Sequence, residues 1–506
     1  MLFRSVLVVL LCVQAALALH TGLTSLDEYV YKDDGHFAFT NSNRQVSGLG
    51  WTAHFWNLTS QKWLTDQNVS RSVWWHHVAV IIPDVVNMSL SSAFVYITGG
   101  ENNNPDSFPS AGDEGLLIAA TVATGAQSVA AVLWQVPNQP LEFPIDPFHD
   151  SRSEDAAIAL TWWKFINDPS DPNWILEYPM TKAGVKCLDM LEQVFPQYLN
   201  GTFITKFLVA GASKRGWTTW LVGAVEAARG DRIQAIAPIV LDALNFIKFA
   251  HRQFTMYGGW TFALQDYYKM NFTQSLDLPN TALLASLIDP YWYRSRLTMP
   301  KLAINAGGDE FQMPDDQRHW ANDMPGEMHT LLMKNAEHSC ATGVIELVQS
   351  VAAFLAGINN NYARPSMSWT IDEASGNITV TTDVAPTTVT IAYSDSGADV
   401  SAGKRDFRWA ALNVSFCPIK VFGGCVRPLL WTTTSDVEQL GPLTYRASFP
   451  LDVNPGGWRA FIIEMQWTNP FDPLLDPFYF TTPASVVPST YPFKDCTGLA
   501  CKGELM

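Results

Sequence analysis

The stretch that decides the fold spans residues 207–217 and reads Phe207-Leu208-Val209-Ala210-Gly211-Ala212-Ser213-Lys214-Arg215-Gly216-Trp217. Its apolar start predicts a buried strand, and the small residues that follow predict a tight turn into a helix beginning near residue 214. A serine on such a turn is held in a strained conformation with its Oγ exposed above the sheet, as a nucleophile requires. The usual pentapeptide is Gly-x-Ser-x-Gly, whereas here Arg215 precedes Gly216 and shifts the second glycine by one position.

Two further candidates follow in the chain order serine, acid, histidine that this kind of site requires. The apolar run 301–306 leads into Asp309, and the run 331–334 leads into His338. Loops at the carboxyl ends of parallel strands meet at one edge of a sheet. We therefore predict a triad in which Ser213 is the nucleophile, His338 the general base, and Asp309 the acid that orients the imidazole.

Other side chains compete for the acid and base roles. The alternative acids lie further from the end of the strand and are Glu310, Asp315 and Asp316. His319 is a weaker base because it lies in a helical stretch. His76 and His77 precede an early strand, and we expect them to be structural.

An oxyanion hole needs backbone N–H groups at the same edge of the sheet. One would come from Lys214, the residue after the nucleophile, and another from Gly99 or Gly100 in the loop after an early strand. The alternative role for these glycines is a turn with positive φ. Arg215 could bind a substrate carboxylate, but we favour an ion pair with a neighbouring acid such as Asp155.

Hydrophobic patterning divides the chain into regions. Residues 20–75 alternate and predict antiparallel hairpins at a sheet edge. From about residue 77, apolar strands alternate with helices, which predicts a mainly parallel sheet covered on both faces. With the serine turn, this pattern is typical of an α/β-hydrolase fold, which we place at residues 19–362. An aromatic-rich helical insertion at about 242–300 is either a lid over the strand ends or an excursion that packs sideways on the core.

The C-terminal part has a different pattern. Beyond Pro365 the helical period disappears, and short strands separated by turn residues predict a β-sandwich at residues 366–482. Residues 483–506 form a tail that carries Cys496 and Cys501. A chain of 506 residues exceeds the size at which one hydrophobic core stops growing, so more than one domain is expected.

Several features predict secretion. Residues 1–18 combine a positive charge, an apolar run and a small-x-small cleavage site, as a signal peptide does. No other stretch holds 18 uninterrupted apolar residues, so we expect no membrane span in the mature chain. The glycosylation sequons are Asn57, Asn68, Asn87, Asn200, Asn271, Asn377 and Asn413.

Cysteine number and net charge narrow the function further. Cys12 leaves with the signal peptide, and an even number of remaining cysteines favours disulfides. Short separations favour the pairs Cys417–Cys425 and Cys496–Cys501, which leaves Cys187–Cys340 by elimination. No Cys-x-x-Cys pair is present, so we expect no zinc. The net charge of -16 repels phosphate backbones and argues against a nucleic-acid partner.

These motifs resemble the PhoPQ-activated pathogenicity-related protein family. The likeness runs from about residue 25 to 360, through Trp74-Trp75-His76-His77, Ile97-Thr98-Gly99-Gly100, Gln135-Val136-Pro137-Asn138-Gln139-Pro140, Gly211-Ala212-Ser213-Lys214-Arg215-Gly216 and Asn305-Ala306-Gly307-Gly308-Asp309-Glu310. The resemblance implies an α/β-hydrolase fold related to serine peptidases of the dipeptidyl-peptidase type, with an appended β domain. It carries the nucleophile to Ser213, the acid to Asp309 and the base to His338.

Two classes of function follow from these expectations. The first is a secreted serine hydrolase without cofactor or metal, acting on a small ester or peptide. The second is a secreted signal that binds a cell-surface receptor, because eukaryotic relatives in the family include a secreted autocrine proliferation repressor. A third possibility is polysaccharide binding by the C-terminal sandwich, although its aromatic residues are more often part of a core.

Overall fold

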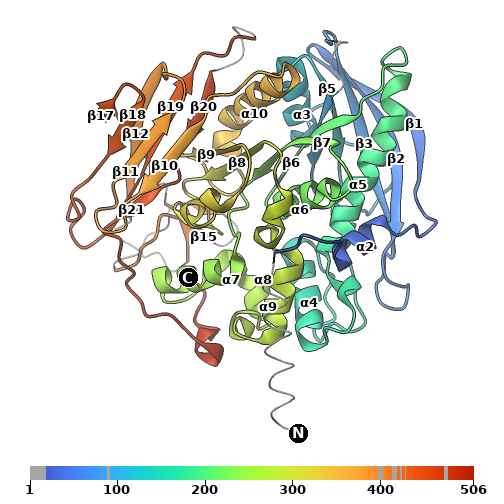
Figure 1. The fold of residues 1–506 in the computed structure, drawn as a ribbon. Helices are drawn as coiled ribbons and strands as arrows, with labels where there is room; N and C mark the ends of the chain where they lie inside the picture. Colours follow the sequence, from blue (N-terminus) through green and yellow to red (C-terminus); the bar gives the residue numbers. More distant parts are fainter. Residues whose placement is uncertain are drawn as a thin grey trace. The chain divides into compact units, whose positions relative to one another are not determined.

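The computed structural model describes residues 19–87, 92–396, 403–412, 417, 419–421, 424–427, 429–471 and 477–506 (Figure 1). The expected signal peptide at residues 1–18 and the sequon at Asn413 lie outside the described residues. The chain forms two compact units. The first contains residues up to 238 together with 270–300, and the second contains 239–269 together with 301–506.

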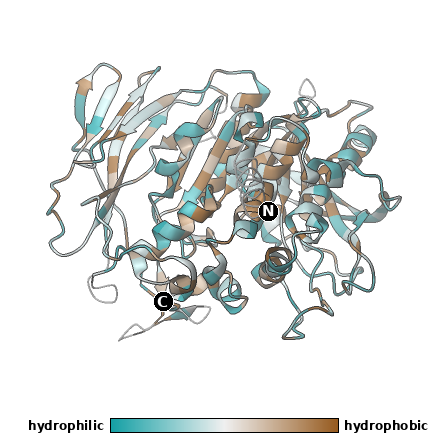
Figure 2. Cartoon of the chain, turned by 60° about the horizontal axis from the view of Figure 1, so that its bottom comes forward, coloured by the Kyte–Doolittle hydropathy of each residue, from teal (hydrophilic) through white to brown (hydrophobic). Residues whose placement is uncertain are grey.

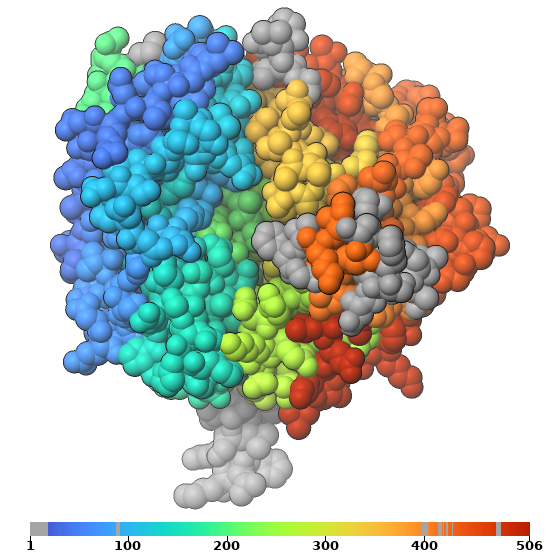
Figure 3. Space-filling view, turned by 180° about the vertical axis from the view of Figure 1, so that it is seen from behind, coloured from blue at the N-terminus to red at the C-terminus, as the bar shows by residue number. Residues whose placement is uncertain are grey.

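The first unit is built on a mixed sheet with the strand order β1-β2-β3-β5-β4-β6-β7. The strands are β1 (Ala38–Gly48), β2 (Trp51–Lys62), β3 (Val73–Pro83), β4 (Ser92–Ile97), β5 (Val129–Leu133), β6 (Lys206–Ala212) and β7 (Ile233–Ile239), the last of which ends at the start of the second unit. The neighbouring pairs β1–β2, β2–β3 and β3–β5 are antiparallel. The strand β4 is parallel to both of its neighbours, β5 and β6. The predicted antiparallel edge is confirmed, and its blue segments form one side of this unit in Figure 3.

Helices cover both faces of this sheet. They are α2 (Ser25–Tyr31), α3 (Glu114–Gly125), α4 (Glu154–Asn167), α5 (Glu177–Val194), α6 (Lys214–Ala227) and α9 (Pro279–Ile288). Gly115 of α3 lies against Val132, and Gly184 of α5 lies against Ile97. Val132 pairs with Tyr96, and consecutive side chains on a strand point to opposite faces. The two helices therefore lie on opposite faces of the sheet.

Burial on both faces explains the sequence of the inner strands. Every residue of β4 and β5 is buried, so these strands read as continuous apolar runs and do not alternate. Figure 2 shows hydrophobic residues, in brown, on some of the protein's strands. The longer β2 alternates more clearly, since it pairs antiparallel near the edge.

The second unit begins with two parallel strands, β8 (Lys301–Ala306) and β9 (Met328–Met333). Its helices are α7 (Phe246–Tyr257), α8 (Gln265–Lys269) and α10 (Val344–Asn359). Val240, which follows β7, donates its N–H to the carbonyl of Ile304 on β8 at 2.7 Å. The parallel pairing extends the predicted pattern as far as the strands that precede Asp309 and His338.

Antiparallel sheets form the C-terminal part of this unit, as predicted. One sheet has the order β10-β11-β18-β17, another joins β16-β12-β19-β20 with β21, and a small third has the order β13-β15-β14. The strands are β10 (Met367–Ile371), β11 (Ile378–Thr382), β12 (Thr388–Asp395), β13 (Ala410–Ala411), β14 (Lys420–Val421), β15 (Gly424–Val426), β16 (Thr432–Thr434), β17 (Glu438–Gly441), β18 (Thr444–Ala447), β19 (Arg459–Trp467), β20 (Phe478–Thr481) and β21 (Ser485–Val487). Trp431 and Trp458 belong to a buried apolar cluster that also includes Leu332 of β9. These aromatic residues are part of a core.

One helical segment in the described part of the chain, Ala341–Asn359, is long and apolar enough to cross a membrane. Its most apolar window is 61% buried inside the protein. Leu347, Val351 and Phe354 are buried, and α10 contacts β8 and β20. In this structure the segment is a core helix of the second unit.

The insertion at 242–300 divides between the two units. Its first part, with α7, belongs to the second unit, where Gln253 donates to the carbonyl of Phe311 at 2.9 Å. Its last part, with α9, belongs to the first unit, where Trp217 donates its indole N–H to the carbonyl of Ile288 at 2.6 Å. Several of its aromatic residues are buried, among them Tyr257, Trp260 and Tyr293. These rings pack within their own units.

Two of the three predicted disulfides are confirmed. Cys417–Cys425 and Cys496–Cys501 form with Cα–Cα distances of 5.5 and 4.9 Å. The prediction of Cys187–Cys340 is wrong, because both residues are buried and form no disulfide. Elimination assumed that every cysteine is oxidised, but Cys187 packs inside α5 as a small apolar side chain. Burial raises the pKa of its thiol, which keeps the thiol protonated.

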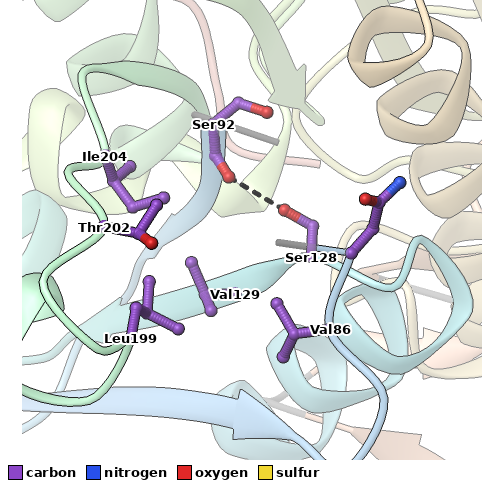
Figure 4. A pocket seen from close by; sticks show the side chains of 8 residues that line it. Val86, Ser92, Ser128, Val129, Leu199, Thr202 and Ile204 are labelled. Carbon is purple, nitrogen blue, oxygen red and sulfur yellow. Dashed lines mark hydrogen bonds between the residues drawn. The ribbon is translucent and has the colours of Figure 1, made fainter. Parts of the chain in front are cut away.

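A small hollow lies where β4 and β5 begin (Figure 4). Val86, Val129, Leu199 and Ile204 line it, and Ser128 donates its hydroxyl to the carbonyl of Ser92 at 2.9 Å. Its volume of about 10 Å³ is close to the least that holds one water molecule. It is a packing defect at the edge opposite Ser213, since Ser213 follows the carboxyl end of β6.

The buried carboxyl of Glu177, at the start of α5, makes stability depend on pH. Glu177 is 3% exposed and accepts the indole N–H of Trp162 at 2.9 Å. Burial raises its pKa from 4.5 to about 7. The folded state therefore binds an extra proton between these values, and stability falls as pH rises through this window.

We predict that Glu177→Gln removes this loss. At pH 8 the variant should be more stable by about 2–3 kcal/mol, since its amide has no charge to bury. At pH 4 the two proteins should unfold at similar temperatures. Thermal midpoints across this range are the measurement, and parallel curves for both proteins would contradict the prediction.

Candidate active site

Ser213 occupies the turn between β6 and α6. Its backbone has φ 57° and ψ −125°, which an L-residue adopts only where the surrounding structure enforces it. The side chain is part-exposed, whereas Lys214 and Arg215 after it are buried. This geometry is that of a strained strand-to-helix turn which presents a serine hydroxyl.

Gly211 explains why the turn closes although Arg215 replaces the usual second glycine. A Cβ at Gly211 would lie 2.7 Å from the carbonyl oxygen of Arg215 and 2.9 Å from its Cβ. Distances this short are not tolerated, so the glycine before the serine is required here. The side chain of Arg215 points away and donates to the carbonyl of Val136 at 2.5 Å.

Backbone N–H groups gather beside this serine in the first unit. Ile97 pairs with Gly211 in the parallel β4–β6 ladder, so the loops after these strands leave the sheet side by side. Those loops contain Gly99 and Gly100 on one side and Lys214 on the other. Within the described residues, none of these three N–H groups donates a hydrogen bond. They are the donors that the sequence predicted for an oxyanion hole, and that role stays a prediction.

Charged side chains after the serine form a compact cluster. Arg215 binds both carboxylate oxygens of Glu154, at 2.5 and 2.6 Å. Lys214 binds Glu154 at 2.9 Å and Asp155 at 3.0 Å. The predicted ion pair of Arg215 therefore exists, but its partner is Glu154 and Asp155 pairs with Lys214. Burial alone would raise the pKa of Glu154, but Arg215 and Lys214 together hold it well below its ordinary value.

The predicted acid and base lie in contact in the second unit. His338 Nδ1 lies 2.7 Å from Asp309 Oδ2, with Nδ1 as the donor to the carboxylate. The other carboxylate oxygen accepts the N–H groups of Phe311 and Gln312, at 2.7 and 3.1 Å. These bonds fix the carboxylate and leave Nε2 as the nitrogen able to act as a base. The imidazole also lies against the ring of Phe311.

Glu310 is a site residue whose contact the sequence analysis missed. It was considered only as a substitute for Asp309, but its Oε2 accepts the backbone N–H of His338 at 3.1 Å. Burial, followed by the neighbouring carboxylate of Asp309, raises its pKa to about 7. In the sequence, only its position next to Asp309 pointed to Glu310. The contact itself depends on the path of the loop after β9, which carries His338.

The remaining candidates have structural roles. Asp315 pairs with Arg405 at 2.8 Å, and Asp316 accepts the N–H of Met313 at 2.9 Å. His319 is held neutral because burial lowers its pKa to about 4. The same applies to His76, which contacts the hydroxyl of Ser60 and the carbonyl of Trp134 at 2.9 and 3.0 Å. His77 contacts the side chain of Asn57 at 3.1 Å.

One group in the described part of the chain has metal-ligand types close together: His251, Cys496 and Cys501. The two cysteines form a disulfide, so they offer no thiolate to a metal. His251 contacts Asp495 at 2.8 Å. The set does not fit a metal site.

The structure thus gathers the predicted residues into two groups. Asp309 and His338 are in contact within the second unit. Ser213, Lys214 and the two loop glycines lie at one edge of the sheet in the first unit. The approach of Ser213 to His338 stays a prediction from the order of the strands and the loops that follow them.

Sequence comparison supplies the identification. Residues 26–408 match the family described as PhoPQ-activated pathogenicity-related protein. The chain belongs to this family. A relative, autocrine proliferation repressor protein A of Dictyostelium discoideum, is 34% identical over 493 residues, covering 95% of this chain and 94% of its own length.

Solved structures that this chain resembles include esterases and a peptidase. Acetyl xylan esterase 1 from a Thermoanaerobacterium species matches 65% of this chain and 93% of its own, with a TM-score of 0.42 and 13% identity. The acylaminoacyl peptidase of Pyrococcus horikoshii matches 68% of this chain and 45% of its own, with a TM-score of 0.36 and 12% identity. This member of the PhoPQ-related family has an α/β fold, with parallel strands covered by helices and antiparallel sheets at the C-terminus.

The backbone of Ser213 gives a prediction that is independent of any substrate. Ser213→Gly and Ser213→Ala both remove the hydroxyl, but only glycine adopts positive φ without strain. We predict that the glycine variant is more stable than the alanine variant by about 1 kcal/mol, after the greater flexibility of unfolded glycine is subtracted. Denaturant unfolding of both variants measures the difference. A more stable alanine variant would show that the turn is unstrained.

Proposed function

We propose that this chain is a secreted serine hydrolase that cleaves a small ester or peptide bond through an acyl-enzyme. The observation that carries the proposal is the backbone of Ser213, which is held at positive φ beside N–H groups without acceptors. A strained, part-exposed serine does not stabilise a hydrophobic core, and such strain is typical of functional sites. The contact between Asp309 and His338 supports the same reaction.

Each residue has one role in the proposed reaction. Ser213 Oγ attacks the carbonyl carbon while His338 Nε2 accepts its proton. Asp309 holds the imidazole by Nδ1 and stabilises its charged form. The N–H groups of Lys214 and the Gly99–Gly100 loop bind the oxyanion. His338 then protonates the leaving group, and a water molecule activated by the same imidazole releases the acid and restores Ser213.

A second candidate function is extracellular signalling. The relative with 34% identity carries the name of an autocrine proliferation repressor. A signal of this kind would act by binding a cell-surface receptor, with or without catalysis. The two functions make different demands on Ser213, because receptor binding does not require its hydroxyl.

A fluorophosphonate probe tests the enzymatic proposal. We predict that Ser213 Oγ displaces fluoride and becomes phosphonylated in the wild-type protein, and that Ser213→Ala is not labelled. Asp309→Asn should slow labelling by about 10³–10⁴-fold, because the imidazole loses its correct tautomer. In-gel fluorescence over time measures the rate. A folded wild-type protein that does not react would favour receptor binding.

Glycosylation tests the proposed secretion, and the fold separates two of the sequons. Asn57 lies within β2 between two paired strands, and its side chain contacts His77. Asn200 is exposed in the loop after α5. We predict that Asn200→Gln lowers the mass of the secreted protein by one glycan and that Asn57→Gln does not. Unchanged masses for both variants, or secretion without any glycan, would contradict this prediction.

A further inference from the structure

The ion pair between Arg215 and Glu154 has no role in the proposed reaction, yet Arg215 lies only two residues after Ser213, in the first turn of α6. Arg215 Nη2 and Nη1 bind the two carboxylate oxygens of Glu154, and Nε binds the carbonyl of Val136. All three nitrogens of the guanidinium group are therefore engaged. The two terminal nitrogens that would bind a carboxylate in a bidentate pair already hold Glu154, so we look for the role of Arg215 inside the protein.

The guanidinium group supports the loop that follows β4. A Cβ on Gly99 would lie 2.5 Å from Nη2 and 2.9 Å from Cζ of Arg215, so the loop backbone rests directly on the guanidinium group. The same loop is hydrogen-bonded to the segment around Val136, whose carbonyl accepts from Arg215. In this segment the N–H of Gln135 donates to the carbonyl of Gly99 at 2.9 Å. Val136 donates to the carbonyl of Thr98 at 3.2 Å.

Glu154 reaches the same loop by a second route. Its Oε1 accepts the amide of Gln139 at 2.5 Å, and its backbone N–H donates to Gln139 Oε1 at 2.8 Å. Gln139 in turn exchanges hydrogen bonds with Asn102, at 2.6 and 3.1 Å. The loop from Gly99 to Asn102 is thus held at both ends by one ion pair.

The backbone of Glu154 is consistent with such a role. Glu154 begins α4 with φ 55°, in the left-handed region that is costly for a residue with a side chain. A bidentate pair with arginine is geometrically specific and can offset this cost. Strain at a residue that touches the site through its partner points to a positioning function.

We propose that Arg215 and Glu154 act as positioning residues: they clamp the Gly99–Gly100 loop so that its N–H groups face the N–H of Lys214 and form the oxyanion hole. The predicted effect of the clamp on catalysis rests on the proposed hydrolase function. Its predicted effect on the position of the Gly99–Gly100 loop does not. Ser213 and the N–H of Lys214 lie at the start of α6, and Arg215 follows them directly. The arginine therefore fixes the distance between the N–H groups of the Gly99–Gly100 loop and the N–H group of Lys214, which together form the oxyanion hole.

The chain offers a matched control at the other end of α6. Glu226 binds Arg232 through Nε and, at 2.9 Å, through Nη2. In each pair one partner is buried and the other is part-exposed: Glu226 and Arg215 are the buried partners, and Arg232 and Glu154 the part-exposed ones. Glu226→Gln should cost stability in the same way as Glu154→Gln, but it touches no part of the Gly99 loop.

The experiment compares Arg215→Lys, Glu154→Gln and Glu226→Gln in the full-length secreted protein with two readouts. Fluorophosphonate kinetics separate the maximal labelling rate from the initial binding constant. We predict that the two clamp variants lose about 10²-fold in the labelling rate, as when an oxyanion donor is removed, with the binding constant within about twofold. Glu226→Gln should keep the wild-type labelling rate.

Hydrogen exchange at Thr98 and Asn102, whose N–H groups donate to the carbonyls of Leu133 and Gln139, is the second readout and does not depend on activity. We predict faster exchange in Glu154→Gln than in Glu226→Gln. If Glu154→Gln fails to fold, Gly99→Ala keeps both charges and should lower the labelling rate by pushing the loop off Arg215. Clamp variants that match Glu226→Gln in both readouts overturn the proposal. A wild-type protein that is not labelled while Glu154→Gln loosens the loop refutes the hydrolase and leaves the clamp standing.

Discussion

The constraint on which the site depends is the left-handed backbone of Ser213. A serine at φ 57° costs free energy, so the turn exists only because its flanks are fixed. β6 pairs with β4 up to Gly211. The helix α6 begins at Lys214, and its first side chains are buried. Gly211 lets the chain pass the carbonyl of Arg215. The strained, part-exposed serine is thus a consequence of a rigid sheet, a buried helix and one required glycine.

In each unit, charged side chains near the candidate site residues form hydrogen-bonded groups. Burying a charge is tolerated only when it is paired and hydrogen-bonded. Lys214 and Arg215, which directly follow the serine, pair with Glu154 and Asp155 at the start of α4. In the second unit, Asp309 is held by two backbone N–H groups and by His338. Both groups keep functional side chains rigid, which pre-organises a site before a substrate arrives.

Local sequence was enough to predict the parts of the fold that depend on local order. The apolar run at 207–210 and the small residues after it predicted β6 and the turn, and the strands before Asp309 and His338 predicted their contact. Pairings between distant segments could not be predicted this way. Glu154 was not recognised as the partner of Arg215, and Glu310 was not recognised as an acceptor for His338, because each depends on how a later loop returns. Elimination failed for Cys187 and Cys340, since a buried cysteine does not need to form a disulfide.

The central claim is that Ser213 and His338 meet at one edge of the sheet, with the oxyanion donors beside them. A crystal structure of the phosphonylated protein tests it most directly. The account predicts phosphorus bonded to Ser213 Oγ, a phosphonyl oxygen about 3 Å from the N–H groups of Lys214 and the Gly99–Gly100 loop, and His338 Nε2 within hydrogen-bond distance of Oγ. An adduct on another residue, or an imidazole turned away from Ser213, would contradict it.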